Sequence, residues 1–184
     1  MDVIEAMRDR KSTRAYLDKP VARTTLEAIL DAARWAPSGV NCQPWHVEIV
    51  NGAIKAQISK ALLVARQTRT PENPDYAYYP TEWRDPYNAR RKATGHALYQ
   101  ALNINKDDPS ARLKAWNNNY HFFGAPAGLL FFVDRALAQG AWVDMGMFIQ
   151  NVMLAARGFG LETCPQASLA EYPDIVRNIL DVPS

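Results

Sequence analysis

The fold is decided by the stretch Pro37-Ser38-Gly39-Val40-Asn41-Cys42-Gln43-Pro44-Trp45. It offers small turn-forming residues, then side-chain amides at Asn41 and Gln43, and then an entry into a strand. Amide donors and acceptors match the alternating carbonyl and imino edge of a pyrimidine-like ring. Gly39 permits backbone conformations or close approaches that a side chain would obstruct. An ordinary helix-to-strand loop explains Pro37 and Ser38 well, but it explains the two amides poorly.

A second cluster, Arg10-Lys11-Ser12-Thr13-Arg14, lies nearer the N-terminus. Arg10 and Ser12 supply a cation and a hydroxyl donor of the kind that a phosphate binds. Arg14 is a cation that would stabilise the negative charge of a reduced flavin at its pyrimidine edge. The alternative is a solvated basic segment, since basic residues at a helix end complement its dipole. Together the two clusters suit a large planar heterocycle that carries a phosphate.

The composition indicates one ordinary folded domain. No repeat, low-complexity tract or Gly/Ser linker divides residues 1–184, and 48% of them are hydrophobic and 22% charged. A net charge of +2 gives no electrostatic reason to expect nucleic acid or a membrane as a partner. No apolar run approaches the ~20 residues that a bilayer-spanning helix needs. The N-terminus lacks the layout of a secretion signal, so we expect a cytoplasmic protein.

The cysteines and histidines match no metal site and no catalytic pair. Cys42 and Cys164 lie far apart, without metal-ligand spacing, and a disulfide is not expected in a chain without an export signal. Cys164 has no histidine near it in sequence, so we expect it to line a pocket or to be structural. His46 and His96 are expected at the surface or in packing, and His121 in the core. We expect no bound metal.

The hydrophobic pattern predicts helices at residues 3–9, 53–66, 88–103, 109–118 and 170–180. A further helix is predicted to begin at Thr24, where Thr24 and Glu27 form a capping box, and to stop before Pro37. Strands are predicted at residues 45–49 and 127–134, the second buried on both faces. Alternating helices and strands indicate α/β or α+β architecture, although two strands rarely make a stable sheet alone.

Two segments point beyond the fold of one chain. Residues 142–157 form a predicted helix that is apolar nearly all round and ends at Gly158 and Gly160. Such a helix is enclosed in a large core or at a subunit interface, and we favour the interface. Residues 70–87 hold four prolines, four tyrosines and Trp83, which predicts an ordered loop that covers something. Its rings either form a structural cover or stack on a flat substrate.

The two clusters, read as Arg-x-Ser-x-Arg and then Ala-Pro-Ser-Gly-x-Asn-x-Gln-Pro-Trp, resemble the nitroreductase family of FMN-dependent oxidoreductases. Residues 122–126 and 160–167 also resemble that family, so the resemblance covers nearly the whole chain. It implies an α+β nitroreductase-like fold, with a central, mostly antiparallel sheet flanked by helices in an intertwined homodimer. Family members usually continue into a further strand and an arm that embraces the partner subunit. We expect that strand and arm to be absent from this sequence.

Carried over position by position, the resemblance implies a flavin site at the homodimer interface. The residues expected to hold the FMN phosphate, the ribityl chain and the N1/O2 edge are Arg10, Ser12 and Arg14. The residues expected to reach the flavin from the second subunit are Pro37, Ser38, Gly39 and Asn41, and Gln43 is similar to them in position. The residues expected to line the ring are Pro165, Gln166 and Ala167. The backbone N–H of Ala167 would point at N5.

The implied function is reduction of an aromatic acceptor, above all a nitroaromatic, by NAD(P)H through flavin N5 in a ping-pong reaction. The cofactor carries the hard chemistry, so the lack of an acid–base pair does not count against an enzyme. An alternative keeps the flavin and changes the acceptor to a quinone, an activated alkene or a halogenated aromatic. A second alternative is a flavin-binding redox protein without turnover.

Overall fold

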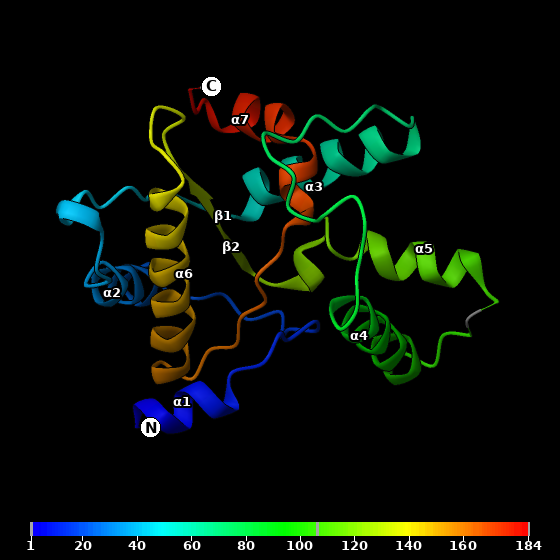
Figure 1. Ribbon diagram of the computed structural model, residues 1–184, viewed down its shortest axis with the longest axis horizontal. Helices are drawn as coiled ribbons and strands as arrows, with labels where there is room; N and C mark the ends of the chain where they lie inside the picture. Colours follow the sequence, from blue (N-terminus) through cyan, green and yellow to red (C-terminus); the bar gives the residue numbers. More distant parts are fainter. Residues whose placement is uncertain (1, 106, 184) are drawn as a thin grey trace. The chain divides into compact units, whose positions relative to one another are not determined.

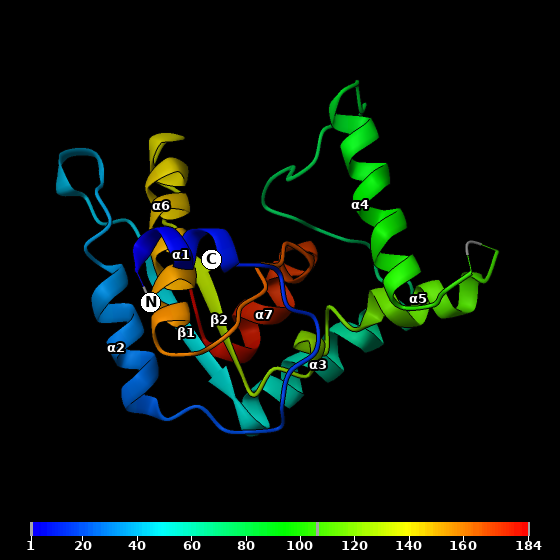
Figure 2. The same ribbon diagram turned by 90° about the horizontal axis from the view of Figure 1, so that it is seen from below.

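The computed structural model describes residues 2–105 and 107–183, and within them it contains seven α-helices, three short 3-10 helices (η) and two strands (Figures 1 and 2). The α-helices are α1 (Val3–Asp9), α2 (Arg23–Ala33), α3 (Gly52–Gln67), α4 (Tyr87–Ala101), α5 (Pro109–Asn117), α6 (Gly140–Gly158) and α7 (Pro173–Leu180). The strands are β1 (His46–Asn51) and β2 (Ala127–Phe132), and the 3-10 helices are η1 (Gly39–Asn41), η2 (Phe122–Gly124) and η3 (Ser168–Glu171).

The chain divides into two compact units, which are described separately. The first unit contains the residues up to Ala56 together with Gly124–Pro165, and the second contains Gln57–Phe123 together with the residues from Gln166 onward. Whether the whole chain acts as the single domain expected from the sequence stays a prediction.

The first unit is built on a two-stranded antiparallel sheet packed with α2 and α6. The strands pair from His46 opposite Phe132 to Asn51 opposite Ala127. The core cluster combines residues of α2, of the turn after it and of α6: Ile29, Ala33, Ala36, Met145, Phe148, Val152 and Ala156. At the start of β1, the ring of Trp45 stacks on Phe148, with centroids 4.7 Å apart and planes 8° from parallel. The helix and strand periods thus meet in one apolar layer.

The second unit is mainly helical and contains most of α3, then α4, α5, η3 and α7. Its buried apolar residues lie on α3, on the turn after α5 and around α7: Ile58, Leu62, Ala65, Tyr120, Phe122, Leu169, Tyr172 and Val176. Arg66 donates to the Tyr120 hydroxyl at 3.2 Å, and that hydroxyl donates to the Glu171 carboxylate. These polar contacts join α3 to η3 through Tyr120.

Most predicted elements are confirmed, and α1 has the predicted bounds. Asp2 caps that helix, because its carboxylate accepts the N–H groups of Ile4 and Glu5 at 2.7 and 3.0 Å. Helix α6 ends at Gly158 as predicted, and Gly160 follows with a φ of +71°.

The predicted capping box at Thr24 is wrong. Helix α2 begins at Arg23, and its N-cap residue Ala22 makes no side-chain cap. Glu27 instead pairs with Arg23 at 2.7 Å, one helical turn away. The helix ends at Ala33, short of Pro37, because the chain passes through turns after Arg34.

Three further expectations need correction. Every residue of β2 is only partly buried, because a two-stranded sheet leaves part of each strand uncovered. His121 is exposed, and its Nδ1 lies 3.3 Å from Ser59 Oγ. The last helix begins at Pro173, since residues 168–171 form η3.

Candidate functional site

The Arg10–Arg14 stretch runs beside the segment that follows α6. Ser12 and Thr163 form a parallel bridge, and the Thr13 N–H donates to the Thr163 carbonyl at 3.0 Å. Extended backbone sends successive side chains to opposite sides. The pairing therefore separates Lys11 and Thr13 from Arg10, Ser12 and Arg14.

A polar brace fixes the Thr13 side of this stretch. The Thr13 hydroxyl donates to Glu162 Oε2 at 3.2 Å, and Arg157 donates to the other oxygen of that carboxylate. The side chain of Arg157 is only 15% exposed, so its charge is held against Glu162 with little competition from water. The brace ties the Arg10–Arg14 stretch to the end of α6.

On the other side, the three residues predicted to hold a phosphate and a ring edge gather around the Cys164 thiol. Burial raises the pKa of Cys164, while the charges of Arg14 and Arg10 and a hydrogen bond with Ser12 act against that rise. Arg14 Nη1 also donates to the Ser12 carbonyl at 3.3 Å. Two guanidiniums and one hydroxyl beside a half-buried thiol form a donor set that suits an anionic group. The residues present thus fit the phosphate and the electron-rich edge of FMN.

Tyr16 belongs to the same side, although neither sequence motif includes it. It is half-buried, and burial together with the nearness of Cys164 and Glu162 raises the pKa of its hydroxyl. The phenol therefore remains a hydrogen-bond donor at any physiological pH. Its signal in the sequence was the spacing, since it continues the alternate positions of Arg10, Ser12 and Arg14.

The Pro37–Trp45 turn is shaped by its own side chains. The Gln43 N–H donates to Ser38 Oγ at 2.9 Å, and the Gln43 side-chain amide donates to Asn41 Oδ1 at 2.9 Å. Val40, Asn41 and Gln43 all have left-handed backbones, with φ of 47°, 58° and 50°. The amides at positions 41 and 43 thus contact each other, and the turn presents them at an exposed tip.

Helix α6 holds the start of this turn. Asp144 Oδ2 accepts the Gly39 N–H at 3.1 Å, a contact across the chain that the sequence did not predict. A Cβ added at Gly39 would lie 3.8 Å from the same oxygen, which is ordinary van der Waals contact. The expected need for glycine at position 39 therefore does not arise within this chain.

The two predicted halves of the site lie at opposite ends of α6 (Figure 1). The turn is held at Asp144, and the Arg10–Arg14 stretch pairs with Thr163, beyond the helix end at Gly158. Along the helix, Asp144 to Gly158 spans about 21 Å at the usual rise of ~1.5 Å per residue. One chain does not bring the two motifs together.

The residues predicted to line the ring are divided between the two units. Pro165 is exposed and follows Cys164 at the end of the first unit. Gln166 and Ala167 begin the second part of the other unit, where the Gln166 amide donates to the Asn119 carbonyl at 3.0 Å. Ala167 is partly buried and immediately precedes η3.

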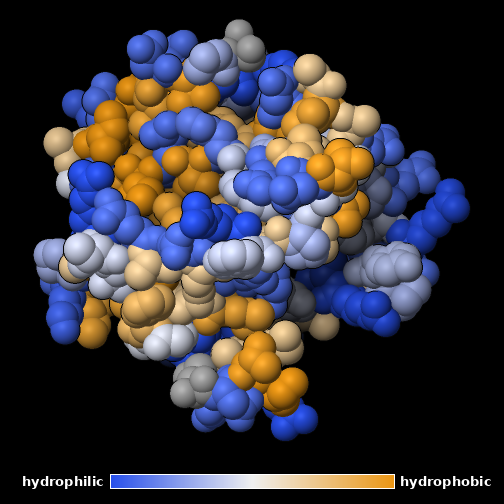
Figure 3. Space-filling view, turned by 90° about the vertical axis from the view of Figure 1, so that its left-hand side faces the viewer, coloured by the Kyte–Doolittle hydropathy of each residue, from blue (hydrophilic) through white to orange (hydrophobic). Residues whose placement is uncertain are grey.

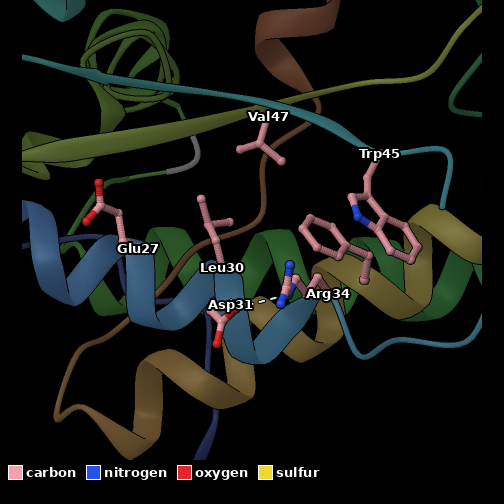
Figure 4. Close-up of a pocket in the computed structure, with 7 residues that line it drawn as sticks. Glu27, Leu30, Asp31, Arg34, Trp45 and Val47 are labelled. Atoms are coloured by element: carbon pink, nitrogen blue, oxygen red, sulfur yellow. Dashed lines mark ion pairs between the residues drawn. The ribbon is translucent and has the colours of Figure 1, made fainter.

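An open groove of about 440 Å³ lies between α2, β1 and α6, and Trp45 at the end of the turn is one of the residues that line it. Figure 4 shows Leu30, Trp45 and Val47 directed into it, with the Asp31–Arg34 ion pair at its rim at 2.9 Å. Figure 3 views the side of the molecule that carries α2 and the Pro37–Trp45 turn, where hydrophobic patches alternate with hydrophilic residues.

Two other kinds of feature are absent from residues 2–105 and 107–183. No group of three or more His, Cys, Asp or Glu side chains is arranged to hold a metal ion. None of the helices in these ranges combines the length and the apolar character that crossing a membrane requires.

Known proteins resemble the chain over nearly its whole length. A profile of the nitroreductase family matches residues 7–184. The chain is 36% identical over 171 residues to a 4-nitrobenzoate reductase of Pseudomonas putida. The matched stretch covers 93% of this chain and 74% of the relative. It is 35% identical over 181 residues to the nitrobenzene nitroreductase of Ectopseudomonas oleovorans. That match covers 97% of this chain and 79% of the relative.

A solved structure agrees with these likenesses. The crystal structure of the FMN and NADPH-dependent nitroreductase NfnB from Sphigopyxis sp. strain HMH matches with a TM-score of 0.96 at 38% identity. The match covers 100% of this chain and 83% of that chain. The shared architecture confirms the fold class that the sequence predicted.

Proposed function

Because this chain belongs to the nitroreductase family, we propose that it is an FMN-dependent oxidoreductase that uses NAD(P)H to reduce nitroaromatic compounds. The observation that carries the proposal is the pairing of Ser12 and Thr13 with Thr163, which brings the Arg10–Arg14 stretch beside Cys164. Arg10, Ser12 and Arg14 form the donor set that a flavin phosphate and an electron-rich ring edge require. The names of the relatives supply the class of acceptor.

Each residue near Cys164 has a proposed role toward FMN. Arg10 and Ser12 bind the phosphate and the ribityl chain, and Arg14 lies at the N1/O2 edge, where its charge favours the anionic reduced form. FMN held by these residues would supply hydride transfer between NAD(P)H and the acceptor. The brace through Glu162 orients the Arg10–Arg14 stretch before any ligand arrives.

The segment after Cys164 lines the ring in this proposal. Pro165 and Gln166 would border it, and the backbone N–H of Ala167 would be the donor to the ring. A backbone donor does not depend on the side chain, so a substitution at Ala167 that preserves the turn keeps this contact.

A second copy of the chain completes the site. We assign Pro37, Ser38, Gly39, Asn41 and Gln43 to the flavin of the partner subunit. The roughly 21 Å along α6 between the two motifs supports this assignment, because one chain cannot bring both of them to one ring. Nothing within the chain requires glycine at position 39, where a Cβ would make only an ordinary contact with Asp144, so a ligand from outside the chain would explain the glycine there.

The apolar side chains left uncovered on the first unit support a homodimer. Helix α6 buries one stripe in the core, yet Trp142 and Val143 remain 47% and 65% exposed. On α1, which packs on α6, Ile4 and Met7 are 51% and 50% exposed. Apolar surface of this kind is typical of a subunit interface.

The aromatic loop of residues 70–87 is proposed to stack on the acceptor. Tyr78 and Tyr79 are 61% and 60% exposed, and their rings meet edge to face at 4.7 Å. Exposed rings at this spacing provide flat apolar surface for a flat aromatic molecule.

The cytosolic location expected from the N-terminal sequence stays a prediction.

The test is the absorption spectrum of the purified protein before and after anaerobic addition of NADPH or NADH. We expect a yellow protein that is bleached by one of the two and recovers its colour when 4-nitrobenzoate or nitrobenzene is added. Recovery with quinones, activated alkenes or halogenated aromatics, but not with nitroaromatics, would favour the alternative acceptors. A yellow protein that neither nicotinamide bleaches would be a flavin-binding protein without turnover.

A further inference from the structure

The aromatic loop has little packing of its own to hold it in place. Among residues 71–86 only Tyr76 and Trp83 are partly buried, and the rest are exposed. Tyr79 lies 5.6 Å from Trp83, and the Arg91 guanidinium of α4 lies 5.1 Å from the Trp83 ring. These contacts order the rings at the far end of the loop. The base of the loop needs a separate attachment.

Hydrogen bonds to η3 and α7 tie down that base. The Asn73 N–H donates to the Glu171 carbonyl at 3.0 Å, and its side-chain amide donates to the Asp174 carboxylate. Two residues on, Asp75 accepts from both terminal nitrogens of Arg177, at 2.6 and 3.3 Å. Arg177 also donates to Asp174 Oδ1 at 2.7 Å, so one guanidinium joins the loop to its own helix.

The side chain of Arg177 is buried against carboxylates and is not a solvent-exposed cation. It is only 9% exposed, and a buried guanidinium is tolerated when carboxylates take up its donors. The hydrogen bond with Asp75 raises the pKa of Arg177, so its charge is permanent. Pro173 and Val176 are buried on the same short helix, which makes α7 a fixed platform for the loop.

We propose that Arg177 is a positioning residue, whose two-pronged contact with Asp75 holds the aromatic loop in the conformation that receives a flat aromatic acceptor. The effect of this contact on the binding of an aromatic acceptor rests on the proposed function. The contact itself lies entirely within the second unit. Arg177 is buried and its guanidinium is taken up by Asp75 and Asp174, so we expect its loss to act through the loop, changing acceptor recognition and leaving the reduction of FMN by NADPH as it was.

The first test reads the loop directly. Arg177→Lys keeps the positive charge but loses the paired donors of the guanidinium. Asp75→Asn keeps the shape of the side chain but loses the negative charge that accepts those donors. We expect chymotrypsin to cleave after Tyr76 and Tyr78 at least about tenfold faster in both variants than in the wild-type protein, because cleavage follows the population of the opened loop. Arg23→Lys, which alters an exposed Arg–Glu pair in the first unit, should cleave at the wild-type rate.

The second test reads recognition in the FMN-loaded enzyme. The KM for 4-nitrobenzoate should rise by about fivefold in both variants, a loss of positioning. Turnover with ferricyanide, which needs no stacking surface, and anaerobic reduction by NADPH should stay within about twofold of wild type. Wild-type cleavage in both variants would overturn the proposal, as would faster cleavage with an unchanged KM. Colourless protein would instead sink the flavin assignment, while the proteolysis still reports on Arg177.

Discussion

Val40 holds a left-handed backbone at the tip of the Pro37–Trp45 turn, with a φ of 47° and a fully exposed side chain. That conformation costs about 1–2 kcal/mol for an ordinary residue, and asparagine tolerates it better. We expect Val40→Asn to raise the free energy of unfolding by about 1 kcal/mol, as measured by urea denaturation.

A matched control separates the backbone effect at Val40 from the loss of an exposed apolar side chain. Val143 is 65% exposed but lies within α6, so Val143→Asn should leave stability unchanged or lower it. If Val40→Asn also lowers stability, the strain at position 40 is not relieved by asparagine and the explanation fails. If Val40→Asn raises stability, Val40 is a strained residue in a turn that we assign to a ligand, and such residues are typical of functional sites.

Arg14 is the cation assigned to the ring edge, so its removal should appear in the redox balance of bound FMN. Arg14→Ala should lower the two-electron reduction potential by about 30 mV, which corresponds to roughly 1.4 kcal/mol. Redox-dye titration of the variant under anaerobic conditions measures this. Lys11→Ala is the control, because Lys11 lies on the opposite side of the extended stretch. Equal potentials in wild type and both variants would remove Arg14 from the ring edge.

At the scale of elements, Glu171 couples η3 to the rest of the second unit and gives it a pH dependence. Burial raises the pKa of Glu171 above its usual 4.5, a rise that the Tyr120 hydrogen bond only partly offsets. The folded chain therefore holds this proton to higher pH than the unfolded chain does. It follows that the free energy of unfolding falls as pH rises from below 4.5 through the raised pKa.

Glu171→Gln removes that titration and keeps an acceptor for Tyr120. The difference in urea midpoint between the variant and the wild-type protein should therefore shift in favour of the variant as pH rises from about 4 to 7. A difference that is flat across this range would mean that Glu171 has the same pKa in the folded and unfolded chains.

Local patterns predicted the elements that local chemistry determines. The hydrophobic pattern was enough to place α1 at residues 3–9, and Gly158 with Gly160 marked the end of α6. The start of α2 was misplaced because Thr24 and Glu27 fit a capping box, yet Glu27 also fits an ion pair with Arg23. Sequence spacing alone does not decide between two such partners for one carboxylate.

The sequence predicted residues for the candidate site, whose roles stay predictions, but it could not predict the contacts that hold them. Alternation placed Arg10, Ser12 and Arg14 on one side, but their neighbour Cys164 comes from the far end of the chain. Asp144, which holds the start of the turn, was equally out of reach. Such contacts join residues more than a hundred positions apart in sequence. They depend on how α6 packs, and no local sequence pattern specifies that packing.

At the scale of the whole molecule, the two motifs at opposite ends of α6 require a second chain if they serve one flavin. In a two-fold symmetric dimer, each site would combine Arg10 of one chain with Asn41 of the other. Arg10→Ala and Asn41→Ala each damage both sites of their own homodimer. A mixed dimer, however, has one site with both residues intact and one with neither.

Mixing these two variants should therefore restore FMN binding that neither has alone. Random exchange makes about half of the dimers mixed, so about one quarter of all sites should retain FMN after gel filtration. Mixing Arg10→Ala with Ser12→Ala is the control, since both changes lie in the same half of the site and no intact site can form. Recovery in the control, or none in the test when tagged subunits show that mixed dimers exist, would mean that each flavin is held by one chain alone.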